Sequence, residues 1–410
     1  MHTANPPQEN CQEAKTAPSG NSEQSKLLGL LCSPWLSVAL IVLLSALSFG
    51  RSLGSYFLAD DIGEVRYVHE IFNGRWDLFW SNFCGNYMQV PNMSVYRPML
   101  LLSLVFDYLL WKGNALGYYL SNLIYFSGAA ALLCILLRKL CAGFGKARAA
   151  AVGFSAAVLF TCNPLHCESI SWVVGRVDTA CCMFYLAALC LFVSRSQAKQ
   201  KQYLALTAAG LFAFVLAICT KEMAIGFAPV VAAIAFFFPQ TESADFKARL
   251  ATAWQSSRPA WIATAIYFLV RFLSLGTLLG GYNGSVGASQ SANALTKWMD
   301  LDNWHRLFFP IPLDLYQGVA WQEQAMATTY TVLAFLLFLR LISGSMPWRH
   351  CAFLLFWALT QVAPIYRLWG LGFNLEGARF CFFLTLSLSS ALPIIFFAPD
   401  KKIPKAISLK

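Results

Sequence analysis

Charge is scarce in this chain of 410 residues: Asp, Glu, Lys and Arg together make up 12% of it, whereas hydrophobic residues make up 58%. This balance excludes an ordinary soluble domain, in which about a quarter of the residues are charged. The short alternating segments of a membrane β-barrel are also missing, because the apolar runs are far longer than about ten residues. We therefore expect an all-α polytopic membrane protein whose helices satisfy their own backbone hydrogen bonds in lipid.

The usual signatures of a zinc site are absent as well. The sequence has no CxxC pair, and its five histidines do not cluster. Most of the thirteen cysteines fall in apolar runs, where Cys packs as a small hydrophobe. Cys84, Cys162 and Cys167 are expected at the outer face, where an oxidising compartment would permit one disulfide among them, whose pairing stays open. No organelle-retention or lipidation motif is present, so a bacterial inner membrane is the simplest location.

Ten apolar segments are interpreted as transmembrane helices. An even number of spans places both termini on the same side of the membrane. If that side is the cytoplasm, most of the 30 basic residues lie inside and most of the 20 acids lie outside. The net charge of +10 is thus an orientation signal and does not indicate a nucleic-acid partner. The predicted spans are roughly 30–50, 114–137, 149–162, 178–194, 203–219, 223–238, 259–279, 328–342, 350–366 and 378–397.

Three regions follow from these spans. Residues 1–27 are polar and predicted to be a disordered cytoplasmic segment, residues 28–398 form the transmembrane domain, and residues 399–410 form a basic cytoplasmic tail. Two outer loops, 51–113 and 280–327, are large enough to build a site. The first holds an apolar run over 99–111, which is too short to span and is expected to be an interfacial helix. The second opens with a Gly/Ser/Asn-rich stretch and is expected to be a mobile loop.

Two adjacent acids, Asp60 and Asp61, begin the first outer loop about ten residues beyond the first span. A carboxylate in this position can remove a proton from an acceptor hydroxyl, and in a like-charge pair one carboxylate has a raised pKa. The alternative interpretation is a solvated turn or a helix N-cap. Their placement at the outer membrane surface favours the chemical role, and the sequence leaves open which of the two is the base.

Several cations lie near the outer ends of the spans, among them Arg97, Arg176, Lys221 and Arg379. Taken singly, each could be an interfacial charge that reaches out of the lipid. Arg271 differs because it falls inside a predicted span, where an unpaired charge is costly and a phosphate or carboxylate is its natural partner. Together the cations indicate binding of an anionic lipid, from which a group is transferred to an outward-facing acceptor.

Five motifs then follow one another in a fixed order and carry a family resemblance. The chain resembles the GT-C superfamily of membrane glycosyltransferases. More narrowly, it is similar over about residues 30–395 to the membrane module of the transmembrane O-mannosyltransferases with tetratricopeptide repeats and to their bacterial relatives. It departs from them because no repeat of about 34 residues is detectable. The motifs are Ala59-Asp60-Asp61-Ile62, Tyr96-Arg97-Pro98, Asn163-Pro164-Leu165-His166-Cys167-Glu168 leading to Val174-Gly175-Arg176-Val177-Asp178, Thr220-Lys221-Glu222, and Glu376-Gly377-Ala378-Arg379-Phe380.

This resemblance implies transfer with inversion from a polyprenyl- or dolichyl-phosphate sugar, with a protein hydroxyl as the acceptor. Asp60 would activate the acceptor, with Asp61 beside it. Arg97, Arg176, Lys221 and Arg379 would line the donor phosphate or sugar, and Arg271 would join them. The supporting residues would be Tyr96, His166, Glu168, Asp178, Glu222 and Glu376.

Two other functions stay open at this point. A transferase that modifies a glycolipid or an envelope polymer would share the donor site and differ only in its acceptor groove. A transporter or flippase of lipid-linked sugars is less favoured, because the charges gather at one face, whereas transporters place them in the middle of the membrane. The sequence does not establish a cofactor, and a divalent metal remains an alternative without identified ligands. The expected partners are the lipid-linked sugar, the bilayer and a protein or glycolipid acceptor.

Overall fold

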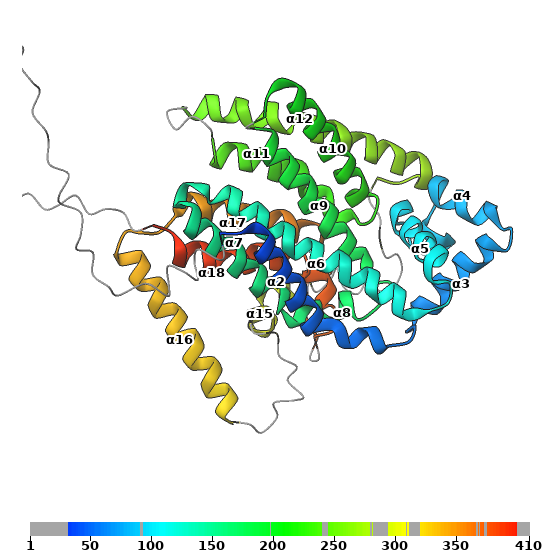
Figure 1. Ribbon diagram of the computed structural model, residues 1–410, viewed down its shortest axis with the longest axis horizontal. Helices are drawn as coiled ribbons and strands as arrows, with labels where there is room; N and C mark the ends of the chain where they lie inside the picture. Colours follow the sequence, from blue (N-terminus) through cyan, green and yellow to red (C-terminus); the bar gives the residue numbers. More distant parts are fainter. Residues whose placement is uncertain are drawn as a thin grey trace, which may run out of the picture.

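The computed structural model is a bundle of helices with a smaller helical cluster at one end (Figure 1). It describes residues 32–90, 93–196, 198–239, 245–278, 281, 294–308, 310, 320–365, 368, 370–372 and 375–399. The predictions for residues 1–27, for much of the loop 280–327 and for nearly all of the tail 399–410 lie outside these residues. Two short helices within that second loop are described, α14 (Ala294–Met299) and α15 (Leu301–Phe308).

A helix lies in each of the ten ranges predicted as spans, and the expected all-α membrane class is confirmed. By length and composition, four segments can cross a membrane: Pro34–Gly54, Ala115–Leu140, Arg176–Arg195 and Gln200–Ile218. A fifth follows if Lys146–Thr161 and Pro164–Ile170, bent by 56°, form one span. The count of ten spans therefore stays a prediction. The ten helices are α2 (Pro34–Phe49), α6 (Ala115–Leu140), α7 (Lys146–Thr161), α9 (Arg176–Arg195), α10 (Gln200–Ile218), α11 (Phe227–Phe237), α12 (Phe246–Leu275), α16 (Ala320–Ile342), α17 (Trp348–Val362) and α18 (Leu384–Phe397).

Helix α6 lies at the centre of the bundle and packs against α2, α7 and α9, while α18 packs on α7 and α10 on α9. Small residues allow this close packing, as is typical of helices in lipid. At Gly153 of α7, a Cβ atom would lie only 2.5 Å from the Cys134 carbonyl oxygen of α6. The twelve cysteines in the described part of the chain are all unpaired, including Cys84, Cys162 and Cys167, so they form no disulfide.

The loop predicted to be the first outer loop folds into a separate small unit (Figure 1), which we call the outer subdomain, built from α3 (Asp60–Phe72), α4 (Trp76–Cys84) and α5 (Pro98–Trp111). Its own apolar core includes Ile71, Leu101 and Leu104, which are fully buried. Helix α5 coincides with the run over 99–111, and its placement at the membrane surface stays a prediction. Val173 and Val177 contribute to the same core, so the start of α9 is anchored to this subdomain.

Short helical turns at the ends of the long helices carry four of the predicted site residues, His166, Glu168, Glu222 and Arg379. The turns are η4 (Pro164–His166) and α8 (Cys167–Ile170) after α7, η5 (Glu222–Gly226) after α10, and η8 (Ala378–Cys381) before α18. Contacts between η4 and η8 and between α8 and η8 bring sequence-distant motifs together. The fold thus gathers the third, fourth and fifth motifs around one end of the bundle.

Candidate active site

Asp61 is a buried anchor between the start of α3 and residues 173–174. Its carboxylate accepts hydrogen bonds from the backbone N–H groups of Leu58 (3.0 Å), Val173 (3.3 Å) and Val174 (2.9 Å). The side chain is fully buried, and this burial, opposed by the three hydrogen bonds, raises its pKa. A carboxylate that caps backbone donors in this way holds the start of α3 against residues 173–174, and it is shielded from a substrate.

Asp60, the first residue of α3, has a different environment. Its side chain is exposed, and no hydrogen bond to its carboxylate is found within the described part of the chain. The preceding Ala59 has φ 45° and ψ −115°, a conformation that costs a non-glycine residue free energy and is often found at functional sites. Of the two predicted acids, Asp60 is therefore the one that a substrate can reach.

Glu64, which the sequence analysis did not single out, lies one helical turn after Asp60 on the same face of α3. The residue as a whole is half-buried, but its Oε2 atom is shielded from solvent and its carboxylate interacts with the buried Tyr87. This burial raises the pKa of Glu64 to about 8. The i, i+4 spacing from Asp60 is the sequence signal that would have found it.

Two arginines converge on Glu222 at the start of η5. Arg97 donates from Nε (3.2 Å) and Nη2 (2.9 Å) to Oε2 of Glu222, and Arg271 donates from Nη1 to Oε1 (3.3 Å). Arg271 also donates from Nη2 to the Ser94 carbonyl oxygen at 2.6 Å. Both arginines are buried, whereas the Glu222 side chain is 28% exposed. Two guanidinium groups against one carboxylate leave a net positive charge at this point, which suits an anionic ligand.

A second pair of cations lies around the ring of Phe380. Lys221 forms an ion pair with the buried Asp178, and its Nζ atom lies 5.9 Å from the ring centroid. The guanidinium carbon of Arg379 lies 5.1 Å from the same ring. Glu168 holds Arg379 in place, with 3.5 Å between the Arg379 Nε and the Glu168 Oε1 and with the Arg379 backbone N–H donating to Oε2 at 3.1 Å.

The Arg379 side chain keeps 25% of its surface exposed, which leaves it open to a ligand. Its guanidinium carbon also lies 5.0 Å from the centroid of the Trp172 ring. Since Trp172 directly precedes the residues that Asp61 binds, the motif around Arg379 is linked to the start of α3.

Arg176 lies apart from these cations, inside the outer subdomain. Its Nη2 atom is 2.6 Å from Oδ2 of Asp107 in α5, and both side chains are at most 1% exposed. The guanidinium also packs on the Tyr118 ring and donates to the Tyr118 carbonyl oxygen at 3.2 Å. A buried pair of this kind serves the packing of α5 and α6 against α9, and its predicted role in donor binding is not supported by any exposed surface.

Two of the remaining predicted residues, His166 and Tyr96, have packing positions. His166 is fully buried, bonds through Nε2 to the Thr385 hydroxyl at 2.8 Å and has its ring centroid 4.4 Å from that of Phe160. Tyr96 is buried and donates to the Phe83 carbonyl oxygen at 3.2 Å. The exposed Glu376 places its carboxylate against Gly372. No three His, Cys, Asp or Glu side chains converge as a metal site in the described ranges, so the metal alternative has no ligand set.

These features define a helical membrane protein with an exposed acid at the start of α3 and clustered cations at the ends of its spans. The expected resemblance is confirmed by known proteins. The chain is similar to protein O-mannosyl-transferase TMTC1 of Homo sapiens, with 29% identity over 41% of this chain and 19% of that protein. It is similar to protein O-mannosyl-transferase Tmtc3 of Drosophila melanogaster, with 30% identity over 41% and 19%.

A third relative, protein O-mannosyl-transferase F38B6.6 of Caenorhabditis elegans, is 25% identical over 51% of this chain and 29% of its own length. The matches with the first relatives span about a fifth of those proteins, at 19%, 17% and 19%. No family model matches the chain. No solved structure matches it either.

Proposed function

We propose that this protein is a membrane glycosyltransferase that moves a sugar, mannose by analogy with its relatives, from a polyprenyl-phosphate or dolichyl-phosphate donor to a protein hydroxyl. The observation that carries the proposal is that residues 172–174 contact both Asp61, the neighbour of Asp60, and the cation Arg379. Asp61 holds residues 173–174 and so fixes the turn that presents Asp60, while Arg379 packs on the adjoining Trp172. The proposed base and a proposed phosphate-binding cation are thus both positioned by residues 172–174.

In the proposed reaction, the Asp60 carboxylate accepts the proton of the acceptor hydroxyl as that oxygen attacks the anomeric carbon of the donor sugar. The bond between the anomeric carbon and the phosphate oxygen breaks, and its electron pair leaves with the polyprenyl phosphate. Cations such as Arg97 and Arg379 stabilise the charge that develops on the leaving phosphate. Attack on the face opposite the leaving group inverts the configuration of the sugar carbon.

We further propose that the site faces outward, which in a bacterial inner membrane is the periplasmic side, with both termini in the cytoplasm. The distribution of Lys and Arg supports this orientation. A protein acceptor is favoured over a glycolipid or an envelope polymer because the relatives are named for transfer to protein.

The test uses purified protein in detergent, a polyprenyl-phosphate mannose with radiolabelled sugar, and a Ser/Thr-rich peptide or a cell-envelope extract. Release of free polyprenyl phosphate and label in protein are expected for the wild type but not for Asp60→Asn. Asp77→Asn is the matched control, because Asp77 is an exposed acid of the same subdomain that pairs with Arg75. Label in lipid alone would favour the glycolipid acceptor, equal turnover of Asp60→Asn would remove Asp60 from the mechanism, and donor binding without any turnover would overturn the proposal.

A further inference from the structure

The short helix α15, in the loop predicted to be the second outer loop, binds the backbone of the loop before η8, which is described over residues 370–372 and 375–377. The Asn303 side chain of α15 is buried, and its Oδ1 atom accepts a hydrogen bond from the backbone N–H of Leu371 at 2.9 Å. Arg306 donates from Nη1 to the carbonyl oxygen of the same residue at 2.7 Å. Both backbone hydrogen-bonding groups of Leu371 are therefore bound by side chains of α15.

The Asn303 amide is itself held in one orientation. Its Nδ2 atom donates to the carbonyl oxygen of Lys297 and to Oδ2 of Asp300, both at 3.1 Å. Leu307, one turn further along α15, is buried in the core of the bundle. Leu301, at the start of the same helix, is 79% exposed. One face of α15 is thus docked on the protein, and Asn303 is a rigid support on that face.

The loop before η8 has a backbone that local forces do not favour. Leu375 has φ 64° and Gly377 has φ 82°. A leucine keeps such a conformation only where the surrounding structure imposes it. Within the loop, the backbone N–H of Gly372 donates to the Glu376 carbonyl oxygen at 2.9 Å. The loop is therefore bonded to itself, and its position depends on what holds its start.

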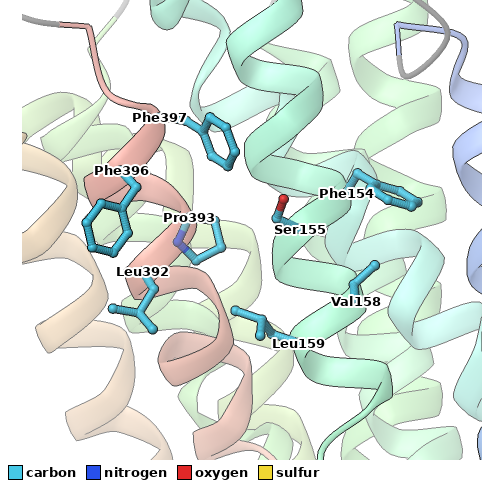
Figure 2. A pocket seen from close by; sticks show the side chains of 8 residues that line it. All are labelled: Phe154, Ser155, Val158, Leu159, Leu392, Pro393, Phe396 and Phe397. Carbon is cyan, nitrogen blue, oxygen red and sulfur yellow. The ribbon is translucent and has the colours of Figure 1, made fainter. Parts of the chain in front are cut away.

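Arg379 lies in η8, between this loop and α18. On the α18 side, buried residues that begin with Leu384 follow η8 directly. The opposite end of α18, which includes Pro393 and Phe397, lines an apolar groove of about 450 Å³ against α7 (Figure 2). The packed start of α18 therefore holds η8 from one side, and the other side is the loop that begins near Leu371.

We propose that Asn303 and Arg306 are positioning residues that set the place of the Arg379 guanidinium, an inference that rests on the proposed function. They act on the backbone of Leu371, and the loop passes the constraint on to η8. A guanidinium presents its donors in a fixed fork, so a displaced Arg379 loses directed hydrogen bonds to the phosphate oxygens of the donor. Residues outside the five motifs thereby control how well the donor is held.

The first experiment is a double-mutant cycle of Asn303→Ala and Arg379→Lys in the full-length protein, with kcat/KM for polyprenyl-phosphate mannose as the readout. We expect each single change to lower kcat/KM about tenfold, which corresponds to about 1.4 kcal/mol. The double variant should be no worse than Arg379→Lys alone, because Asn303 acts through Arg379. Leu301→Ala, on the exposed side of the same helix, is the matched control and should leave kcat/KM unchanged. Additive losses, or no loss in Asn303→Ala, would overturn the inference.

A second measurement does not depend on turnover. Hydrogen exchange of wild type, Asn303→Ala and Leu301→Ala is followed by mass spectrometry in detergent. Faster exchange is expected for Asn303→Ala in peptides that contain Leu371 or Arg379, with exchange in α6 and α9 unchanged. Unchanged exchange in those peptides, or faster exchange throughout the protein, would overturn the inference. The expected exchange pattern together with a wild type that transfers no sugar would instead count against the proposed function alone.

Discussion

A hydrogen bond of 2.9 Å joins the backbone N–H of Val174 to the carboxylate of Asp61. It connects the first turn of α3 to the segment before α9, across more than a hundred residues of sequence. Asp60, the adjacent acid, is exposed and makes no such contact in the part of the chain that the structure describes. The two acids of one motif therefore have different environments: Asp61 is a buried anchor, and the exposed Asp60 is the proposed base.

Asp60→Asn and Asp61→Asn should impair different properties of the protein, the first its activity and the second its stability. We expect the first to lower the rate of sugar transfer by about 100-fold or more, the usual contribution of a general base, with no change in thermal stability. The second should lower the free energy of unfolding by about 1–3 kcal/mol, because buried backbone donors lose a charged acceptor. Transfer assays and thermal unfolding in detergent measure both effects. A stable Asp61→Asn protein would contradict the anchoring role.

Arg176→Ala should destabilise the protein by about 3–5 kcal/mol, because it leaves the Asp107 carboxylate buried without its partner. The double variant Arg176→Met with Asp107→Leu should recover most of this stability, since it replaces the whole pair by apolar groups. Thermal unfolding of the three proteins provides the test. If the double variant is stable but has lost donor binding, Arg176 acts on the donor after all.

Glu64 should make stability depend on pH. Its pKa of about 8 in the folded protein lies above its ordinary value of 4.5, so the folded state binds the proton more tightly than the unfolded state does. The stabilisation is complete below about pH 4.5 and is lost as the pH rises through 8. The difference in Tm between wild type and Glu64→Gln should therefore move in favour of the variant between pH 5 and pH 8. A difference that is constant with pH would contradict this assignment.

Arg97→Lys should raise the KM for the donor by about tenfold, or about 1.4 kcal/mol, with a smaller change in kcat. Lysine keeps the positive charge but cannot reproduce the contact in which both Nε and Nη2 of Arg97 meet Glu222. Steady-state kinetics with purified protein provide the measurement. Arg75→Lys is the control, because the exposed Arg75–Asp77 pair lies in the same subdomain.

The sequence was sufficient to predict the helices, because long apolar runs in lipid have few alternatives to an α-helix. The sequence also placed Arg271 inside a predicted span, where its charge requires a partner. In the structure, Arg271 forms an ion pair with Glu222. The contacts of Asp107 were missed because this residue lies in the run over 99–111, which was interpreted by its apolar character alone. An ion pair between distant helices such as α5 and α9 depends on how they pack, and hydropathy carries no information on that.

The separate environments of Asp60 and Asp61 could not be predicted for a similar reason. Both acids are in the first turn of α3, and either could cap it or face solvent. Their roles depend on where residues 173–174 come to lie, and the packing of Val173 and Val177 into the core of the outer subdomain decides this. Local sequence therefore predicted that an acid is present, and tertiary packing selected which of the two is exposed.

Residues 172–174 have a final consequence. Asn122 of α6 donates to the carbonyl oxygens of Trp172 and Val173 at 2.8 and 3.3 Å, and the Asp61 carboxylate accepts a hydrogen bond from the backbone N–H of Val173. Arg379 rests on the ring of Trp172. The separation between Asp60 and that cation is thus set by protein contacts and not by the depth at which each helix settles in lipid. Bilayers of different thickness can tilt the long helices while the spacing of the proposed base and this cation stays the same.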